Sequence, residues 1–203
     1  MGKDLPLLAS ATVHEAAGRI GALPSAIKPL DPGMQLSATA FPVRMPPGDN
    51  LWIHRAVYAA QPGDVLVVDA GDGFEHGYWG EVLTVAAMAR GLAGLVIAGG
   101  VRDSQQLIRL GWPVFSERVC IAGTGKDPAG VGSLGEGITI GGVAIARGDM
   151  VVGDADGVVV IPSSRIDEVI AASQRREEAE AGYMDRLRAG ESTLSIYHLP
   201  EER

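Results

Sequence analysis

The stretch Leu95-Val96-Ile97-Ala98-Gly99-Gly100-Val101-Arg102-Asp103 decides the fold, because an apolar run typical of a buried strand ends there in two charged residues. A second apolar run, Val65-Leu66-Val67-Val68, precedes it, and the segment from Trp79 to Gly91 between the two runs has the pattern of a helix. A strand, a helix and a strand in this order form a βαβ unit, whose two strands are parallel. The sequence therefore predicts an α/β fold.

The predicted βαβ unit brings three chemically important residues to one edge of the sheet. Glu81 stands at the start of the helix after the first strand, and Arg102 and Asp103 directly follow the second strand. The segments that follow parallel strands share one edge, and open α/β sheets bind their ligands there. We therefore expect a cation, a carboxylate and a helix N-terminus to meet at this edge.

The composition narrows the class of protein. The 203 residues suit one domain, and a hydrophobic fraction of 46% with only 5% aromatic residues predicts an aliphatic core. The formal net charge of -8, without a basic stripe, argues against nucleic-acid binding. Cys120 is the only cysteine, which excludes an intramolecular disulfide and a multi-cysteine zinc site. Because no apolar run approaches the length of a membrane helix or a signal peptide, we expect a cytoplasmic protein without a membrane partner.

The rest of the chain predicts further helices and a glycine-rich β portion. Thr12 and Glu15 have the spacing of a capping box at the start of a helix that runs to Leu23. Asp156-Gly157 indicates a hairpin turn. We expect one domain over residues 1–203, with a charged C-terminal helix at about 163–189. The other predicted helices cover residues 55–60 and 104–110, and the later strands cover 119–122, 138–140, 143–146, 150–152 and 158–161.

Two glycine-rich segments resemble nucleotide-binding loops but lack the required context. Gly130-Val131-Gly132-Ser133-Leu134-Gly135 matches G-x-G-x-x-G, yet the following residues 136–143 have the pattern of a strand and not of a helix. Gly123-Thr124-Gly125-Lys126 lacks the leading glycine of a phosphate-binding loop, and Asp127 stands where Ser or Thr is needed. A bound nucleotide is therefore disfavoured.

The residues at the predicted edge suit a small carboxylate and a divalent cation. Arg102 can hold a carboxylate in a bidentate pair, and the first amides of the helix, at Gly80, Glu81, Val82 and Leu83, form an anion site that Gly80 leaves open. Asp103 could ligate the cation, and together these groups suit a 2-oxo acid. The alternatives are structural: Asp103 could cap the helix that begins at Ser104, and Glu81 could only complement a helix dipole. His76 is expected at the rim of the site.

The same residues resemble the RraA-like family. The resemblance is carried by Tyr78-Trp79-Gly80-Glu81-Val82-Leu83 and by Gly94 to Asp103, and it extends over roughly Ala11 to Tyr197. The family includes class II 4-hydroxy-4-methyl-2-oxoglutarate / 4-carboxy-4-hydroxy-2-oxoadipate aldolases and the regulator of ribonuclease E activity A. An acidic residue, twenty residues and then Arg-Asp is the pattern of its catalytic members, matched here by Glu81, Arg102 and Asp103.

This resemblance implies an α-β-β-α sandwich similar to swivelling phosphohistidine domains, assembled as a homotrimer or hexamer with its sites between subunits. Asp103 would ligate Mg²⁺ or Mn²⁺, with waters as the other ligands, while Arg102 and the amides of Glu81 to Leu83 would hold pyruvate. An acid from a neighbouring subunit's C-terminal region, Glu177 or Glu178, would complete the site. Gln106 departs from the pattern, because the aldolases usually carry an acid there.

With the resemblance added to these residues, we expect a divalent-metal-dependent aldolase that cleaves 4-hydroxy-2-oxo acids to release pyruvate, with oxaloacetate decarboxylation as a side activity. Arg102, Glu81 and Glu178 are the expected catalytic groups. Arg102 would stabilise enolate charge, and the two acids would orient a water that accepts the hydroxyl proton. The alternative is a non-catalytic RraA-like regulator that binds a ribonuclease. Methyl transfer is disfavoured because no nucleotide loop stands between a strand and a helix.

Overall fold

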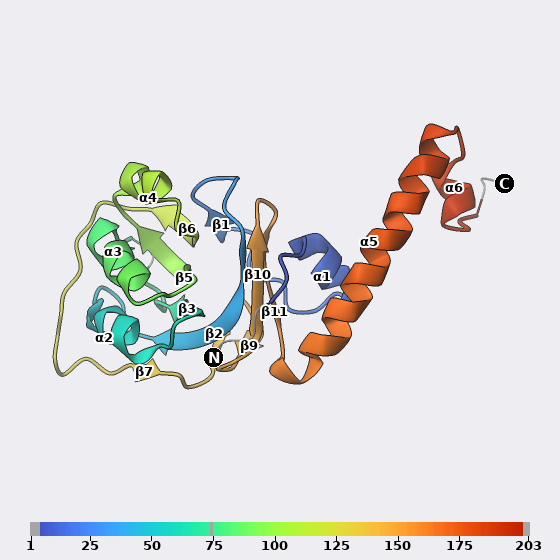
Figure 1. Cartoon of the computed structure of the whole chain (residues 1–203). Coiled ribbons are helices and arrows are strands. Elements are labelled where there is room, and N and C mark those ends of the chain that lie inside the picture. The colour runs from blue at the N-terminus through green and yellow to red at the C-terminus, as the bar shows by residue number, and fades with distance from the viewer. Residues whose placement is uncertain (1–4, 74, 201–203) are drawn as a thin grey trace.

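The computed structural model describes residues 5–73 and 75–200 and confirms the predicted α/β fold. The sheet is strongly curved, and Figure 1 shows the long strand β2 (Leu36–Arg44) bending from one half of it to the other. The strand order is β1-β6-β5-β3-β2-β10-β11, with β4 paired to β5 and β7 to β2. The bounds are β1 (Lys28–Pro29), β3 (Asp64–Asp69), β4 (Gly77–Trp79), β5 (Gly94–Val101), β6 (Val114–Val119), β7 (Ser133–Leu134), β10 (Met150–Asp154) and β11 (Gly157–Ile161).

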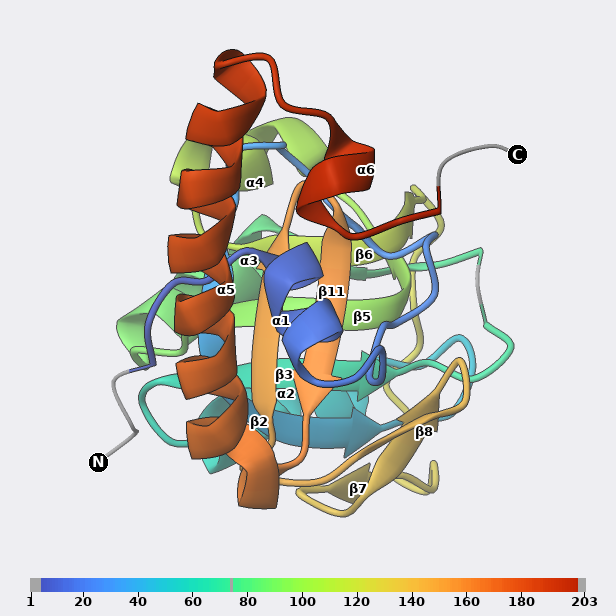
Figure 2. The same ribbon diagram turned by 90° about the vertical axis from the view of Figure 1, so that its right-hand side faces the viewer.

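The helices cover the two outer surfaces of this curved sheet. On one side lie α2 (Leu51–Ala59), α3 (Glu81–Ala89) and α4 (Ser104–Leu110). On the other side α1 (Ser10–Ala16) and α5 (Ile166–Arg188) lie against β10 and β11 (Figure 2). A short helical turn, Ser163–Arg165, precedes α5, and α6 (Thr193–Ile196) follows it. A separate hairpin of β8 (Ile138–Ile140) and β9 (Val143–Ile145) packs inside the curve of the sheet.

Three buried clusters separate the four layers, and the period of two along the strands builds them. In β3, Leu66 and Val68 face the α2–α4 side, whereas Val65 and Val67 face the inside of the curved sheet. In β10, Val151 faces that same interior, and its neighbours pack against α1 and α5. The two halves of this one curved sheet therefore lie between the two groups of helices, which gives the helix, sheet, sheet and helix order of the predicted α-β-β-α sandwich. The likeness to swivelling phosphohistidine domains stays a prediction.

The predicted βαβ unit is confirmed. Strands β3 and β5 are parallel neighbours, paired from Val65 with Gly94 to Asp69 with Ala98, and α3 lies between them in the chain. The short strand β4 also pairs with β5, so the helix begins at Glu81 and not at Trp79. The predicted helix over residues 104–110 is confirmed by α4.

The prediction of a helix from Thr12 to Leu23 was wrong. Helix α1 ends at Ala16, because Gly18, Arg19 and Gly21 all have positive φ angles. The capping box was also wrong: the helix begins at Ser10, whose backbone N–H and hydroxyl donate to the Asp154 carboxylate at 2.7 and 2.6 Å. Tertiary bonds, and not a local cap, fix this end of the helix.

Smaller errors lie at the ends of other elements. The helix expected over residues 55–60 begins at Leu51, and residues 120–122 are not a strand because β6 ends at Val119. The predicted hairpin is confirmed as β10–β11, but its two turn residues are Ala155 and Asp156. Gly157 begins the return strand with a φ of 146°.

The predicted long C-terminal helix is confirmed by α5, which extends well beyond the body of the protein (Figure 1). Its buried residues, Ile166, Val169 and Ser173, all lie in its first part. The rest of α5 therefore adds little to the core of its own chain. Within the described residues, none of the helices combines the length and apolarity needed to cross a bilayer.

The anchor between Asp154 and α1 gives a test of the fold. Burial alone would raise the pKa of Asp154, but hydrogen bonds from Ser10, Asp156 and Gly157 outweigh it, so the net pKa lies below its ordinary value. A depressed folded pKa stabilises the protein above the unfolded pKa, and this contribution disappears as the pH falls through the folded value. Asp154→Ala should lower the free energy of unfolding by about 2 kcal/mol at pH 7, because it orphans donors to a charged group. Urea unfolding measures this difference, which should shrink in acid. Equal stability at pH 7 would contradict the proposed anchor.

Candidate active site

A pocket of about 170 Å³ lies where the predicted site residues converge. Its walls come from the start of α2, from β4, from the start of α3, from the segment after β5 and from the loop after β6. The lining residues are Asn50, His54, Tyr78, Gly80, Val82, Leu83, Arg102, Asp103 and Lys126. Arg102, Asp103 and the α3 N-terminus are thus brought together, as the βαβ unit predicts.

The Asp103 carboxylate joins the two segments. Its Oδ2 accepts the backbone N–H of Glu81 at 3.1 Å, and Arg102 Nε lies 3.9 Å from the same oxygen. Asp103 has a φ of 56°, and its side chain makes no capping bond to its own helix α4. The alternative that Asp103 caps the following helix with its side chain was therefore wrong; it caps α3 instead.

Gly80 is required by this arrangement. A Cβ on Gly80 would lie 2.3 Å from Asp103 Oδ2, so any side chain would push the carboxylate away from the helix. The first hydrogen bond within α3 runs from Thr84 N–H to Gly80 O, at 3.1 Å. The amides of Val82 and Leu83 precede that bond and lie at the pocket wall, where they can donate to an anion.

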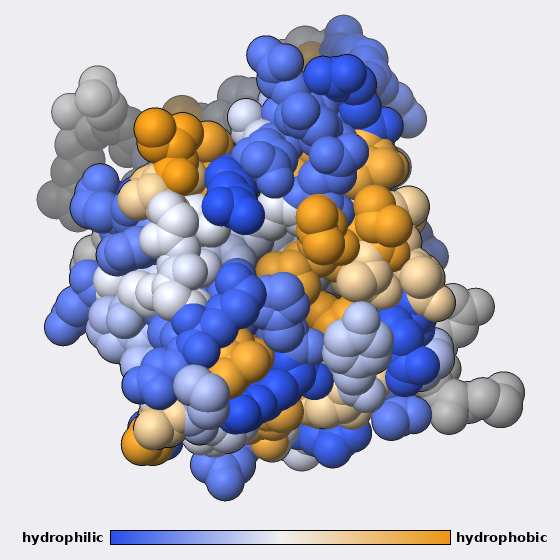
Figure 3. All heavy atoms as spheres, turned by 90° about the vertical axis from the view of Figure 1, so that its left-hand side faces the viewer, coloured by the Kyte–Doolittle hydropathy of each residue, from blue (hydrophilic) through white to orange (hydrophobic). Residues whose placement is uncertain are grey.

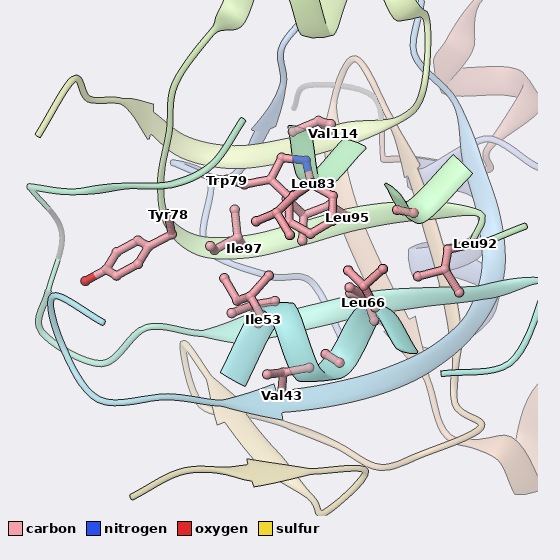
Figure 4. Packing of buried hydrophobic residues seen from close by; sticks show 14 of the residues in the cluster. Val43, Ile53, Leu66, Tyr78, Trp79, Leu83, Leu92, Leu95, Ile97 and Val114 are labelled. Carbon is pink, nitrogen blue, oxygen red and sulfur yellow. The ribbon is translucent and has the colours of Figure 1, made fainter. Parts of the chain in front are cut away.

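A rigid aromatic platform supports the start of α3. Trp79 stacks on Trp112 with ring centroids 5.6 Å apart, and its Nε1 donates to Thr84 Oγ1 at 2.6 Å. Figure 4 shows Trp79 and Leu83 packed over Leu95 of β5. The Arg102 backbone N–H donates to Trp79 O at 2.8 Å, so both sides of the pocket are tied to one core.

Other predicted residues lie apart from the pocket lining. The Glu81 side chain is exposed and does not line the pocket, although its backbone holds Asp103. Gln106 lines a neighbouring shallow depression together with Arg102 and Asp103. His76 packs near Tyr78, with ring centroids 5.7 Å apart, and does not line the pocket. Glu178 is exposed on the extended part of α5, whose residues contribute nothing to the pocket of their own chain.

Sequence reasoning missed Asn50, His54 and Lys126. Asn50 is only 6% exposed; its Nδ2 donates to Tyr78 O at 2.8 Å, which leaves Oδ1 as a buried acceptor without a partner. Such an acceptor in a pocket is suited to a ligand hydroxyl or amide. The only signal for Asn50 in the sequence was its position directly before an apolar helical segment. Lys126 had been considered only as part of a phosphate loop.

His54 is placed to act as a neutral imidazole. Burial, followed by the positive charge of Lys126, lowers the pKa of His54, while the charge of Asp49 acts in the opposite direction. The proton is therefore released more readily than from an ordinary histidine. At neutral pH this ring can both donate and accept hydrogen bonds in the pocket.

The donor set fits a hydrated divalent cation. Asp103 is the only carboxylate residue that lines the pocket, and its Oδ1 has no hydrogen bond from any described residue. Among the described residues there is no cluster of three or more His, Cys, Asp or Glu for a protein-rich site. Mg²⁺ commonly binds through one or two carboxylates and keeps several waters, so a single ligand suffices.

Comparison with known proteins places this geometry in a family. A family model described as RraA-like, Aldolase/RraA, matches residues 10–160. A Halalkalibacterium halodurans protein with the provisional name 4-hydroxy-4-methyl-2-oxoglutarate aldolase is 36% identical over 165 residues, which cover 81% of this chain and 78% of that protein.

Solved structures agree with this match. A Pseudomonas syringae pv. tomato protein aligns with a TM-score of 0.82 at 26% identity, over 95% of this chain and 90% of its own. Streptomyces coelicolor RraAS2, an unusual member of the RNase ES inhibitor RraA family, aligns with a TM-score of 0.72 at 28% identity. The alignment covers 88% of this chain and 91% of RraAS2. The matched sequence and the shared fold together show that the chain belongs to the RraA-like family.

Proposed function

We propose that this protein is a divalent-metal-dependent lyase that cleaves 4-hydroxy-2-oxo acids and releases pyruvate. The single observation that supports it most is the convergence of Arg102, Asp103 and the open start of α3 on one small pocket. The similarity to a protein named as an aldolase agrees with this chemistry. Oxaloacetate decarboxylation is the expected side activity, because it also yields pyruvate through an enolate.

The 2-oxo acid end of the substrate would lie between Arg102 and α3. The Arg102 guanidinium can hold the carboxylate in a bidentate pair, and the Val82 and Leu83 amides add two directed donors. When the bond between the third and fourth carbons breaks, negative charge develops on the pyruvate fragment. Arg102, which lines the pocket, would stabilise that charge.

Asp103 would hold the divalent cation with its free Oδ1, while Oδ2 stays bonded to the Glu81 amide. A bound cation supplies Lewis-acid stabilisation of a 2-oxo group, the property this class of reaction needs. Magnesium and manganese suit the oxygen donor and the waters around it.

Asn50 and His54 would act on the other reacting group. Asn50 Oδ1, buried and without a partner, can accept a hydrogen bond from the substrate hydroxyl. During cleavage this hydroxyl would pass its proton to the unprotonated nitrogen of the neutral His54 ring and become a carbonyl. The protonated ring would then give that proton to the third carbon of the pyruvate fragment, so that no proton is gained or lost overall.

We further propose that the site is completed by a neighbouring subunit. Helix α3 exposes the apolar side chains of Val82, Val85 and Met88, and apolar patches are visible on the face that carries α2–α4 (Figure 3). Val82 is 80% exposed and also lines the pocket, so a partner packed there would close the site. Glu177 or Glu178 on the extended part of α5 could then supply the missing acid to a neighbour, in a trimer or hexamer.

The alternative function is a non-catalytic regulator that binds a ribonuclease, in line with the similarity to the Streptomyces coelicolor protein. A coupled assay for pyruvate, with oxaloacetate or 4-hydroxy-2-oxo acids as substrate and with or without EDTA, separates the two functions. Metal-dependent turnover supports the lyase, and its complete absence supports the regulator.

The first prediction for this function concerns Asp103. Asp103→Ala should abolish pyruvate release and Mn²⁺ binding, at a cost of about 1 kcal/mol for the lost cap of α3. Asp103→Asn is the matched variant, because it keeps an acceptor for the Glu81 amide and removes the charge; it too should lose Mn²⁺ binding, followed by electron paramagnetic resonance. Full turnover in either variant, or in excess EDTA, would refute the metal role.

The second prediction concerns Arg102. Arg102→Lys should lower kcat by roughly 10²–10³-fold, because lysine keeps the charge but loses the planar pair of donors. Steady-state kinetics with oxaloacetate measures the effect. An unchanged kcat with a normal KM would reduce Arg102 to a structural role.

The third prediction concerns assembly. Truncation after Ser173 keeps every buried residue of α5 and should still abolish turnover if the acid comes from a neighbour. Truncation after Arg188 is the control that retains Glu177 and Glu178, and circular dichroism checks both folds. Co-expressed Glu178→Gln and Asp103→Ala chains should regain part of the activity, since some mixed sites contain both intact groups.

Glu177→Gln is the parallel variant in this experiment, because the two acids are adjacent. If neither acid variant loses activity, or if an isolated monomer turns over at the full rate, the shared site is wrong.

A further inference from the structure

A second pocket, of about 490 Å³, shares no lining residue with the pocket beside α3. It lies where β2 and β3 end and where the β8–β9 hairpin packs against them. Arg44, at the end of β2, and Asp69, at the end of β3, form one side of it. The hairpin, with Ile138, Ala144 and Ile145, forms the other side. A volume of this size suits a small ligand.

The period of two along the strands turns the two charged side chains to the inside of the curved sheet. In β3, Val65 and Val67 pack inside the curve, and Asp69 follows on the same face. Arg44 is the register partner of Asp69 on β2 and lines the same pocket. The pocket beside α3 is instead lined by the starts of α2 and α3, on the other face of the sheet. The two pockets are therefore separate places on the molecule.

Arg44 and Asp69 are neighbours of opposite charge that do not pair with each other. Neither side chain forms an ion pair with any residue that the structure describes, and the Arg44 guanidinium donates no hydrogen bond to one. Asp69 Oδ1 accepts the Gly71 N–H at 2.9 Å, which fixes the carboxylate and leaves Oδ2 without a described donor. Adjacent strands are about 4.8 Å apart, so one small ligand can contact both charges.

A buried acceptor that lacks a donor lies near Asp69. Glu117 follows Phe115 by two residues on β6, and Phe115 packs inside the curve of the sheet. Oε2 of Glu117 is buried and has no hydrogen-bond partner among the described residues. Burial raises the pKa of Glu117; the charge of Arg118 opposes this effect, and the charge of Asp69 adds to it. Two carboxyl groups this close favour a ligand that brings N–H donors and positive charge.

The hairpin gives the pocket an apolar wall. Ile138 and Ile145 are register partners across the hairpin and are 6% and 1% exposed, whereas Ala144 beside them is exposed. An aliphatic chain placed against this wall would be removed from water, which favours binding. The pocket therefore combines a cation, an anion and an apolar surface.

We propose that this pocket binds the zwitterion of an aliphatic α-amino acid, with Arg44 on the carboxylate, Asp69 on the ammonium group and the β8–β9 hairpin on the side chain. Arg44 can hold a carboxylate in a bidentate pair. An ammonium group has three donors, of which Asp69 Oδ2 can accept one. A simple carboxylate would meet the charge of Asp69, and a simple amine would leave Arg44 unused. This site is independent of the proposed lyase function.

The test compares three ligands that differ by one charged group. L-Leucine carries both charges, 4-methylpentanoate lacks the ammonium group, and 3-methylbutylamine lacks the carboxylate. Each is titrated into the full chain, with the isoleucine methyl groups labelled for NMR. The Ile138 and Ile145 signals should shift and saturate with leucine, while the signal of Ile53 on α2 stays in place. Leucine should bind at least about tenfold more tightly than either analogue, as expected for one charge-assisted contact.

Two variants test the two charges separately. Arg44→Met should bind leucine and 3-methylbutylamine with about the same affinity, because the carboxylate no longer has a partner. Asp69→Asn should bind leucine and 4-methylpentanoate about equally. The asparagine keeps an acceptor for the Gly71 N–H, so this variant removes the charge and preserves the turn.

Three control variants separate the site from general effects. Arg109→Met removes an arginine on α4, outside the pocket. Asp31→Asn alters a carboxylate that accepts the Gly33 N–H two residues on, as Asp69 accepts its own turn amide. Asp103→Ala alters the pocket beside α3. All three should retain the preference for leucine.

Each outcome decides the proposal. Saturable shifts at the hairpin and a preference for leucine that only Arg44→Met and Asp69→Asn remove support it. It is overturned by the absence of saturable shifts, by similar binding of the three ligands, by shifts confined to Ile53, or by a preference that survives either variant. The ligand comparison uses the unaltered chain, so it decides the proposal even where a variant does not fold.

Discussion

The hydrogen bond from the Glu81 N–H to Asp103 Oδ2 is the interaction on which the site depends. It joins the start of α3 to the end of β5, and it holds Asp103 in the left-handed region with a φ of 56°. It also requires glycine at position 80, because a Cβ there would collide with the carboxylate. Since only one carboxylate oxygen is used, the other is left for a ligand. The same side chain therefore builds the pocket and is available to act in it.

The layered core makes this arrangement rigid. Alternate residues of the central strands pack on opposite sides, so β3 and β5 are buried on both faces and cannot shift by one residue without exposing apolar side chains. The stacked pair Trp79 and Trp112 fixes the approach to α3, and the Arg102 backbone is bonded to Trp79. Strain at Asp103 is thus held by a framework that has no easy alternative packing.

The charge of the pocket differs from that of the whole chain. The protein is acidic, yet the pocket is lined by Arg102, Lys126 and a helix N-terminus against one carboxylate. The extended part of α5 is charged but balanced, with acidic residues and arginines in equal number, and Arg176 and Glu180 pair there at 2.8 Å. The local positive charge of the pocket therefore opposes the net negative charge of the chain, as the proposed binding of an anion requires.

The sequence by itself determined the βαβ unit and the meeting of Arg102, Asp103 and the start of α3. Two short apolar runs and a right-handed crossover leave only one edge where the following residues can lie.

The sequence could not decide which helix Asp103 caps. The local pattern suits α4, whereas the Glu81 amide that donates to the Asp103 carboxylate is distant along the chain. The predicted α1 was too long, although Gly18 and Gly21 are signals of a helix end in the sequence itself. Only the tertiary structure brings Asn50, His54 and Lys126 together in the pocket. They meet because the Asp49 side chain accepts a hydrogen bond from the Asp127 backbone, 78 positions away, and a contact between such distant residues has no periodic pattern by which the local sequence could predict it.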